Sequence, residues 1–153
     1  MNLTVDFKDE QEIYEIRVAM RAVVRKAIFN TLVYEGFDKD VEVSVTFTDN
    51  EHIKELNSQY RNKNVATDVL SFPMFDDFST ALEYDSLPLG DIVISVERAA
   101  LQASHLCHSL YHEVAFLTVH STLHLLGYDH ETSPDDEEEM FRKQREIMEI
   151  IGF

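Results

Sequence analysis

The sequence predicts one α+β (mixed α/β) domain over residues 1–153, in which a roughly four-stranded mixed sheet packs with about five helices. Three observations support this prediction. Short runs in which apolar and polar residues alternate, as in strands, lie between longer runs in which apolar residues recur every three or four positions, as in helices. These runs do not alternate regularly enough for a doubly wound sheet. A chain of 153 residues also has the length of one ordinary domain.

The first half of the chain contains two strand patterns and two helix patterns. In order, they predict a strand at 2–7, a helix from Asp9 to Gly36, a half-buried strand at 41–47, and a helix through Ile53, Leu56 and Tyr60 capped by Asp49 or Asn50. The first helix is amphipathic, and its closing glycine is typical of a helix C-terminus.

The second half begins with a short strand and becomes mostly helical. We expect a strand at 69–72 stopped at Pro73, an acidic loop or hairpin excursion at 74–88, a strand at 91–95, and helices at 96–104, at 110–126 before Gly127, and from Ser133 onward. Ser133 is the expected cap of the last helix. The acidic residues behind Pro134 suit the positive end of its dipole.

The chain is strongly acidic, which limits how it can bind nucleic acid. Thirteen Lys and Arg residues face 29 Asp and Glu residues, and the net charge is −16. Residues 71–153 carry four bases and 16 acids, and account for −12 of that charge. Phosphate contacts need cations, so such a chain is a poor general binder of nucleic acid. An RNA or DNA substrate would have to be held by a few bases in the first half.

Four of these bases form a row on the first predicted helix. Arg17, Arg21 and Arg25 are each four residues apart, and Lys26 lies beside them. Two interpretations are open. The row is either a solvated flank whose charges pair with acids such as Glu12, or a surface that binds phosphates.

The sequence indicates a soluble, cytoplasmic protein without a membrane partner. The N-terminus lacks the charged-then-apolar pattern of a signal peptide, and no run approaches the ~18 apolar residues of a membrane span. Cys107 is the single cysteine, so the chain has no internal disulfide framework. Its apolar flank predicts a buried thiol.

Three histidines near the end of the long helix have the spacing of a metal site. His120 and His124 are four residues apart, so their side chains leave one face of the helix. Gly127 can break the helix and return the chain, which brings His130 toward the same point. Three neutral imidazoles leave the fourth tetrahedral position open, the pattern of a catalytic site. Imidazole ligands suit zinc, copper, iron or nickel, and an open three-histidine site favours one Zn²⁺ per chain.

The residues around these histidines allow several roles. The spacing resembles the second half of the zinc-protease signature, but Ser121 occupies the place of the glutamate base and cannot deprotonate water at neutral pH. Glu113 lies seven residues before His120, on the same face, and fits a supporting or structural role. Asp129 either orients an imidazole or belongs to the turn.

Beyond these spacings, the chain resembles the YbeY family of endoribonucleases. The resemblance rests on three motifs that together cover most of the sequence: His120-Ser-Thr-Leu-His124-Leu-Leu-Gly127-Tyr-Asp129-His130; Leu56-Asn-x-x-Tyr60-Arg61-x-Lys63 with Thr67-Asp-Val-Leu-Ser-Phe-Pro73; and Leu89-Gly-Asp-Ile-Val-Ile-Ser95. The sequence departs from the family pattern at Ser121, Asn64 and Ala66, where a glycine, an aspartate and a proline are usual.

This resemblance implies a function and a site. It implies zinc on His120, His124 and His130, and a catalytic arginine at Arg61. It also implies cleavage of single-stranded RNA, maturation of the 3′ end of 16S rRNA, and quality control of ribosomes. The expected partners are the 16S rRNA precursor and the small ribosomal subunit with its proteins, or an assembly GTPase. From the residues alone, Arg61 is either a phosphate ligand or an ordinary surface arginine.

Two other functions remain open at this point. A zincin-like metallopeptidase would use the same metal helix, although Ser121 replaces its base. A non-catalytic ribosome-assembly factor would use zinc only to rigidify its fold. The net charge of −16 favours a role in contact with protein partners.

Overall fold

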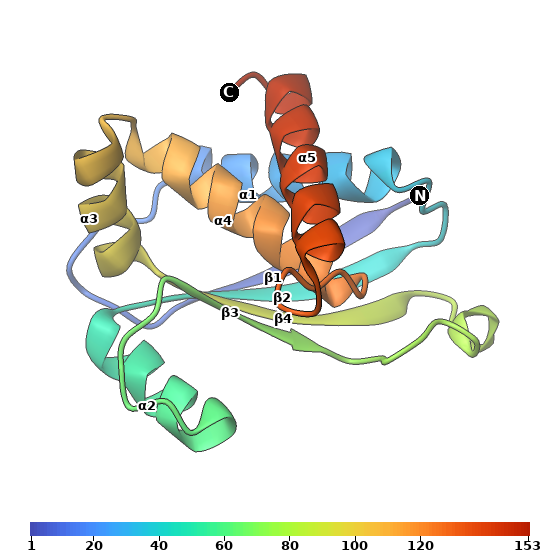
Figure 1. Cartoon of the computed structure of the whole chain (residues 1–153), viewed down its shortest axis with the longest axis horizontal. Coiled ribbons are helices and arrows are strands. Elements are labelled where there is room, and N and C mark those ends of the chain that lie inside the picture. The colour runs from blue at the N-terminus through green and yellow to red at the C-terminus, as the bar shows by residue number, and fades with distance from the viewer.

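A four-stranded mixed sheet runs through the centre of the computed structural model (Figure 1), which describes residues 1–153 apart from the side chain of Leu82. The strands are β1 (Leu3–Asp9), β2 (Val41–Thr48), β3 (Val69–Pro73) and β4 (Leu87–Ser95). Their order is β1-β2-β4-β3, with β3 antiparallel to β4 and the other neighbours parallel. The predicted four-stranded mixed sheet is confirmed.

Helices cover both faces of the sheet, most of them on one side (Figure 1). The helices are α1 (Val18–Tyr34), α2 (Asn50–Arg61), α3 (Val96–Leu106), α4 (Leu110–Leu125) and α5 (Pro134–Ile151), with a 3₁₀ turn at Ala81–Glu83. Helices α1 and α4 pack side by side over one face, and α5 crosses over them. Helix α2 lies on the opposite face, where Ile53 packs with Leu70 and Val93. None of the helices in the described chain is both long and apolar enough to cross a membrane.

The main core lies between the sheet and helices α1 and α4. Alternate residues of β2, from Val41 to Phe47, point into it and are almost fully buried. This alternation is the period-two pattern that predicted the strand. Helix α4 is buried along most of its length because it packs against the sheet, α1, α3 and α5, which makes it a rigid support for side chains at its C-terminal end.

Helix α1 begins at Val18, so the prediction that it starts at Asp9 was wrong. The side chain of Gln11 explains the difference. Its Oε1 accepts hydrogen bonds from the backbone N–H groups of Ile13 and Tyr14, and its Nε2 donates to the Tyr14 carbonyl. These bonds satisfy the local backbone in a non-helical turn and compete with helix formation.

Strand β4 begins at Leu87, four residues before the predicted start at Asp91, so the loop after β3 is shorter than the predicted 74–88. Pro88 and Gly90 lie inside β4, although both residue types are unusual within strands. Gly90 is required by close packing: a Cβ there would lie 2.4 Å from the Phe72 carbonyl oxygen, and its φ is 149°.

Cys107 is exposed, so the prediction of a buried thiol was wrong. It follows the last residue of α3 in a left-handed conformation with φ 56°, where the chain turns away from the core. The apolar residues beside it in sequence therefore do not indicate its own environment.

Candidate metal centre

Three histidines from one helix and the turn after it converge on one point. His120 and His124 lie one turn apart on α4, and their imidazoles leave the same face. Gly127, with a φ of 102°, ends the helix and turns the chain back. His130 thereby joins the other two, and the three ring centroids are 4.6 to 5.3 Å apart. One nitrogen from each ring lies within 4.8 Å of the others.

The nitrogen atoms of this cluster fit a bound metal ion. His120 Nε2 and His124 Nε2 are 3.0 Å apart. Two nitrogens each about 2.0–2.1 Å from one tetrahedral ion would be separated by about 3.3 Å, so a small adjustment suffices. His130 Nδ1 is buried and lacks a hydrogen-bond partner among the described atoms, an arrangement that a metal ion would satisfy. The three histidines could therefore hold one ion and leave a position open toward the solvent.

Gln144 fixes the orientation of His120. The Gln144 Oε1 atom lies 2.9 Å from His120 Nδ1 and accepts its proton. This hydrogen bond leaves the Nε2 lone pair of His120 free to bind a metal ion. Gln144 is 1% exposed and comes from α5, 24 residues further along the chain. The sequence did not identify it, because a glutamine on a helix carries no local signal of such a contact.

Replacing Gln144 by leucine is expected to weaken zinc binding about 10- to 100-fold, because His120 would lose the acceptor that orients it. The variant Gln144→Glu keeps an acceptor and should retain most of the affinity. Competition against a chromophoric chelator measures the zinc dissociation constants of both variants and of the wild type. Equal zinc affinity in the wild type and Gln144→Leu would show that the hydrogen bond does not support the site.

The environment keeps two of the histidines in the neutral form that binds metals. Burial lowers the pKa of His120 to about 4, and the adjacent His124 adds to the effect. Burial is also the main cause that lowers the pKa of His124. Both imidazoles are therefore neutral near pH 7, so protons do not compete with a metal ion at these two positions.

The metal-free protein is expected to lose stability as the pH falls below 6.5. The pKa of His120 is about 4 in the folded protein and 6.5 ordinarily, so between these values the unfolded chain binds more protons. The free energy of unfolding should fall by about 1 kcal/mol per pH unit through this window from His120 alone. Urea unfolding of chelator-treated wild type and His120→Leu isolates this contribution. Equal pH slopes in the two proteins would contradict it.

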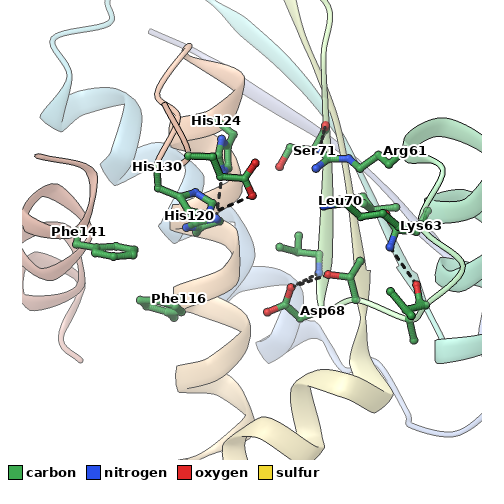
Figure 2. Close-up of a pocket in the computed structure, with 16 residues that line it drawn as sticks. Arg61, Lys63, Asp68, Leu70, Ser71, Phe116, His120, His124, His130 and Phe141 are labelled. Carbon is green, nitrogen blue, oxygen red and sulfur yellow. Dashed lines mark hydrogen bonds and ion pairs between the residues drawn. The ribbon is translucent and has the colours of Figure 1, made fainter. Parts of the chain in front are cut away.

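The three histidines line one wall of a cleft of about 500 Å³ (Figure 2). The opposite wall comes from the end of α2, the following loop and β3, and it carries Arg61 and Lys63, the two basic residues that line the cleft. Arg61 is exposed, and its Nη2 donates a long hydrogen bond of 3.5 Å to the Ser71 carbonyl. Burial is the main cause that lowers the pKa of His124, and the positive charge of Arg61 is among the other causes that lower it. Arg61 therefore lies within electrostatic reach of the metal centre. The structure thus places Arg61 opposite the three histidines.

The row of bases on α1 lies outside this cleft. Arg21, Arg25 and Lys26 are exposed, and none of the four bases lines the cleft. Arg17 pairs with Glu15 at 3.5 Å on the surface. Of the two interpretations, the geometry favours a solvated flank.

The residues near the histidines have structural contacts. Ser121 is fully buried, and its hydroxyl shares a hydrogen bond with the hydroxyl of Ser71, so it joins α4 to β3. Asp129 Oδ1 accepts from the Glu131 backbone N–H at 2.8 Å, which identifies it as a residue of the turn. Glu113 is buried and bonds His108 and Gln102, away from the three imidazoles.

Together, fold and cleft define a class: α+β proteins with an open three-histidine site at the end of a buried helix. A family model described as "Endoribonuclease YbeY" matches residues 5–152. This chain therefore belongs to the YbeY endoribonuclease family, as its motifs predicted.

Individual relatives agree with this membership. The chain is 48% identical over 131 residues to an endoribonuclease YbeY of Alkaliphilus oremlandii, covering 86% of this chain and 85% of the relative. It is 43% identical to an endoribonuclease YbeY of Bacillus cereus over 99% of this chain and 98% of the relative. The solution structure of TM1509 from Thermotoga maritima matches with a TM-score of 0.62 and 26% identity, over 95% of this chain and 88% of that one.

Proposed function

We propose that the protein is a zinc-dependent endoribonuclease that cleaves single-stranded RNA, acting in the cytoplasm in 16S rRNA 3′-end maturation and ribosome quality control. The observation that carries the proposal is the cleft in which three histidines face Arg61 and Lys63. Three imidazoles with an open fourth position suit zinc, and when bound the ion would supply Lewis-acid chemistry at a phosphodiester. Membership of the family supports RNA as the substrate.

The chain's own residues supply the electrostatic part of catalysis. The Arg61 guanidinium can donate two parallel hydrogen bonds to phosphate oxygens, and it needs no rearrangement of the fold because it is exposed at the mouth of the cleft. Lys63 adds a second positive charge to the same wall. A phosphate held between these residues and the histidines would be stabilised as negative charge develops on it.

Single-stranded RNA fits this cleft better than a duplex does. With two basic residues along the cleft of a chain of net charge −16, the protein can neutralise only a few phosphates. A single strand can enter with one or two phosphates and its bases turned outward. We expect weak, salt-sensitive binding to free RNA. Higher activity is expected on ribosomal particles, where ribosomal proteins or an assembly GTPase would hold the RNA near the cleft.

One comparison separates this function from the other two. Wild type and His124→Ala are incubated with free single-stranded RNA, with small-subunit particles and with an unfolded protein. The proposal predicts RNA cleavage by the wild type, faster on particles, and none by His124→Ala. Proteolysis that is lost in His124→Ala would indicate a peptidase. Ribosome binding without metal-dependent cleavage of any substrate would indicate a non-catalytic assembly factor.

A further inference from the structure

A half-buried carboxylate, that of Asp68, faces the metal centre from the opposite wall of the cleft (Figure 2). Burial is the main cause that lowers the pKa of His120, and the charge of Asp68 is among the causes that raise it. The two groups are therefore electrostatically coupled. A negative charge repels phosphates, so the presence of Asp68 in a cleft proposed to bind them calls for an explanation.

Both oxygens of this carboxylate are held in place. Oδ1 accepts from the Val69 backbone N–H at 2.7 Å and from the Thr67 hydroxyl at 3.3 Å. Oδ2 accepts from Gln102 Nε2 at 3.2 Å. The backbone is also fixed, because the Asp68 carbonyl accepts from the Ser95 N–H on β4 at 2.8 Å. The carboxylate is therefore preorganised at one position in the cleft.

A second layer of buried groups holds Gln102. The same Gln102 Nε2 donates to Glu113 Oε1 at 3.0 Å, and Glu113 Oε2 lies 2.6 Å from His108 Nε2. Glu113 is 2% exposed, and burying its carboxylate is costly unless it is well paired. The Glu113–His108 pair joins α4 to the turn after α3, and the Gln102 amide on α3 is held between the two carboxylates. Three elements thus converge on the orientation of Asp68.

The chemistry of a fixed carboxylate restricts what it can recognise. An ionised carboxylate only accepts hydrogen bonds, and Asp68 Oδ2, which accepts one from Gln102, keeps capacity for another, whereas Oδ1 already accepts two. A phosphodiester has no donor to offer. In a nucleic acid strand the donor closest to the phosphates is the ribose 2′-hydroxyl, which DNA lacks.

We propose that Asp68 accepts a hydrogen bond from the 2′-hydroxyl of a nucleotide bound in the cleft and thereby selects RNA over DNA. Gln102 and Glu113 are positioning residues that hold the carboxylate in place for this contact. The inference rests on the proposed function, since it assumes that the cleft binds single-stranded nucleic acid.

The test measures binding, which is separate from cleavage. Fluorescence anisotropy at low salt compares two labelled single strands of the same sequence, one with ribose and one with 2′-deoxyribose throughout and uracil retained. Gels check that the strands stay intact. Zinc-free wild type, which the proposed function predicts not to cleave, should bind the ribose strand about tenfold more tightly, the effect expected for a hydrogen bond to a charged group. Asp68→Ala should bind both strands with nearly equal affinity.

The ratio of the two affinities cancels the general effect of removing a negative charge. Glu131→Gln is the matched control, since Glu131 is an acidic residue that lines the same cleft, and it should keep the wild-type ratio. Gln102→Leu should lower the ratio while leaving zinc content unchanged, which a purely structural role would not predict.

Two results would overturn the inference. Equal binding of both strands by the wild type, or a full preference in Asp68→Ala, would exclude the contact and leave the proposed nuclease function standing. Failure of either strand to bind the wild type would instead contradict the proposed function, and the inference with it.

Discussion

Replacing His124 by alanine is expected to lower zinc affinity by more than about a hundredfold and to abolish metal-dependent RNA cleavage. The expected loss exceeds the 10- to 100-fold effect typical of a supporting residue, because His124 supplies one of three converging nitrogen atoms. Its Nε2 lies 3.0 Å from that of His120, as expected of two ligands of one ion. Without His124, only the imidazoles of His120 and His130 remain to bind that ion. Elemental analysis after dialysis measures the zinc content, which should fall from about one per chain to near zero.

A second histidine variant shows whether this loss is specific. His105 is exposed near the end of α3 and is absent from the cluster of three. His105→Ala should keep both zinc and activity. Unchanged zinc in His124→Ala would mean that the metal binds elsewhere.

Replacing Arg61 by glutamate is expected to lower RNA cleavage at least a hundredfold while the zinc content and melting temperature stay nearly unchanged. The magnitude is that of removing one preorganised donor to a developing negative charge, with a repulsive charge added. The fold should tolerate the change because Arg61 is exposed and makes one long hydrogen bond, to the Ser71 carbonyl. Cleavage kinetics, elemental analysis and thermal unfolding of the same preparation give the three readouts.

Lys54→Glu provides the matched control for Arg61→Glu. Lys54 is an exposed base on the same helix and does not line the cleft. Lys54→Glu therefore has the same net charge as Arg61→Glu but leaves the residues of the cleft unchanged. It should retain most of the activity. If Arg61→Glu unfolds the protein, or if both variants lose activity equally, Arg61 has no specific role at the phosphate.

Local patterns predicted most of the fold, and tertiary contacts explain where they did not. The strand expected at 41–47 and the long helix expected at 110–126 each lie within one residue of β2 and α4, because their apolar residues face one continuous core. The start of α1 was misplaced because the bonds of the Gln11 side chain are invisible in a hydrophobic pattern. The predicted start of β4 was too late because the packing of Gly90 against Phe72 involves a neighbouring strand, which a local pattern does not show.

The same distinction applies to the candidate site. The three histidines lie within eleven residues of sequence, so helical geometry and one glycine sufficed to predict that they would meet. Gln144 and Gln102 reach His120 and Asp68 from 24 and 34 residues away, and a sequence pattern has no means to show these contacts. Asp68 has a local backbone role, since its Oδ1 accepts from the next N–H, but no local pattern shows that its carboxylate is exposed to the cleft.

The most direct test of the account is zinc reconstitution on a defined RNA. Wild-type protein is stripped with a chelator, and then incubated with a 5′-labelled RNA that has one single-stranded and one duplex segment, before and after one equivalent of zinc is added. The account predicts internal cuts that appear only after zinc is added, lie only in the single-stranded segment, and are absent with His124→Ala. Cuts that persist without zinc, or that His124→Ala produces equally, would contradict it.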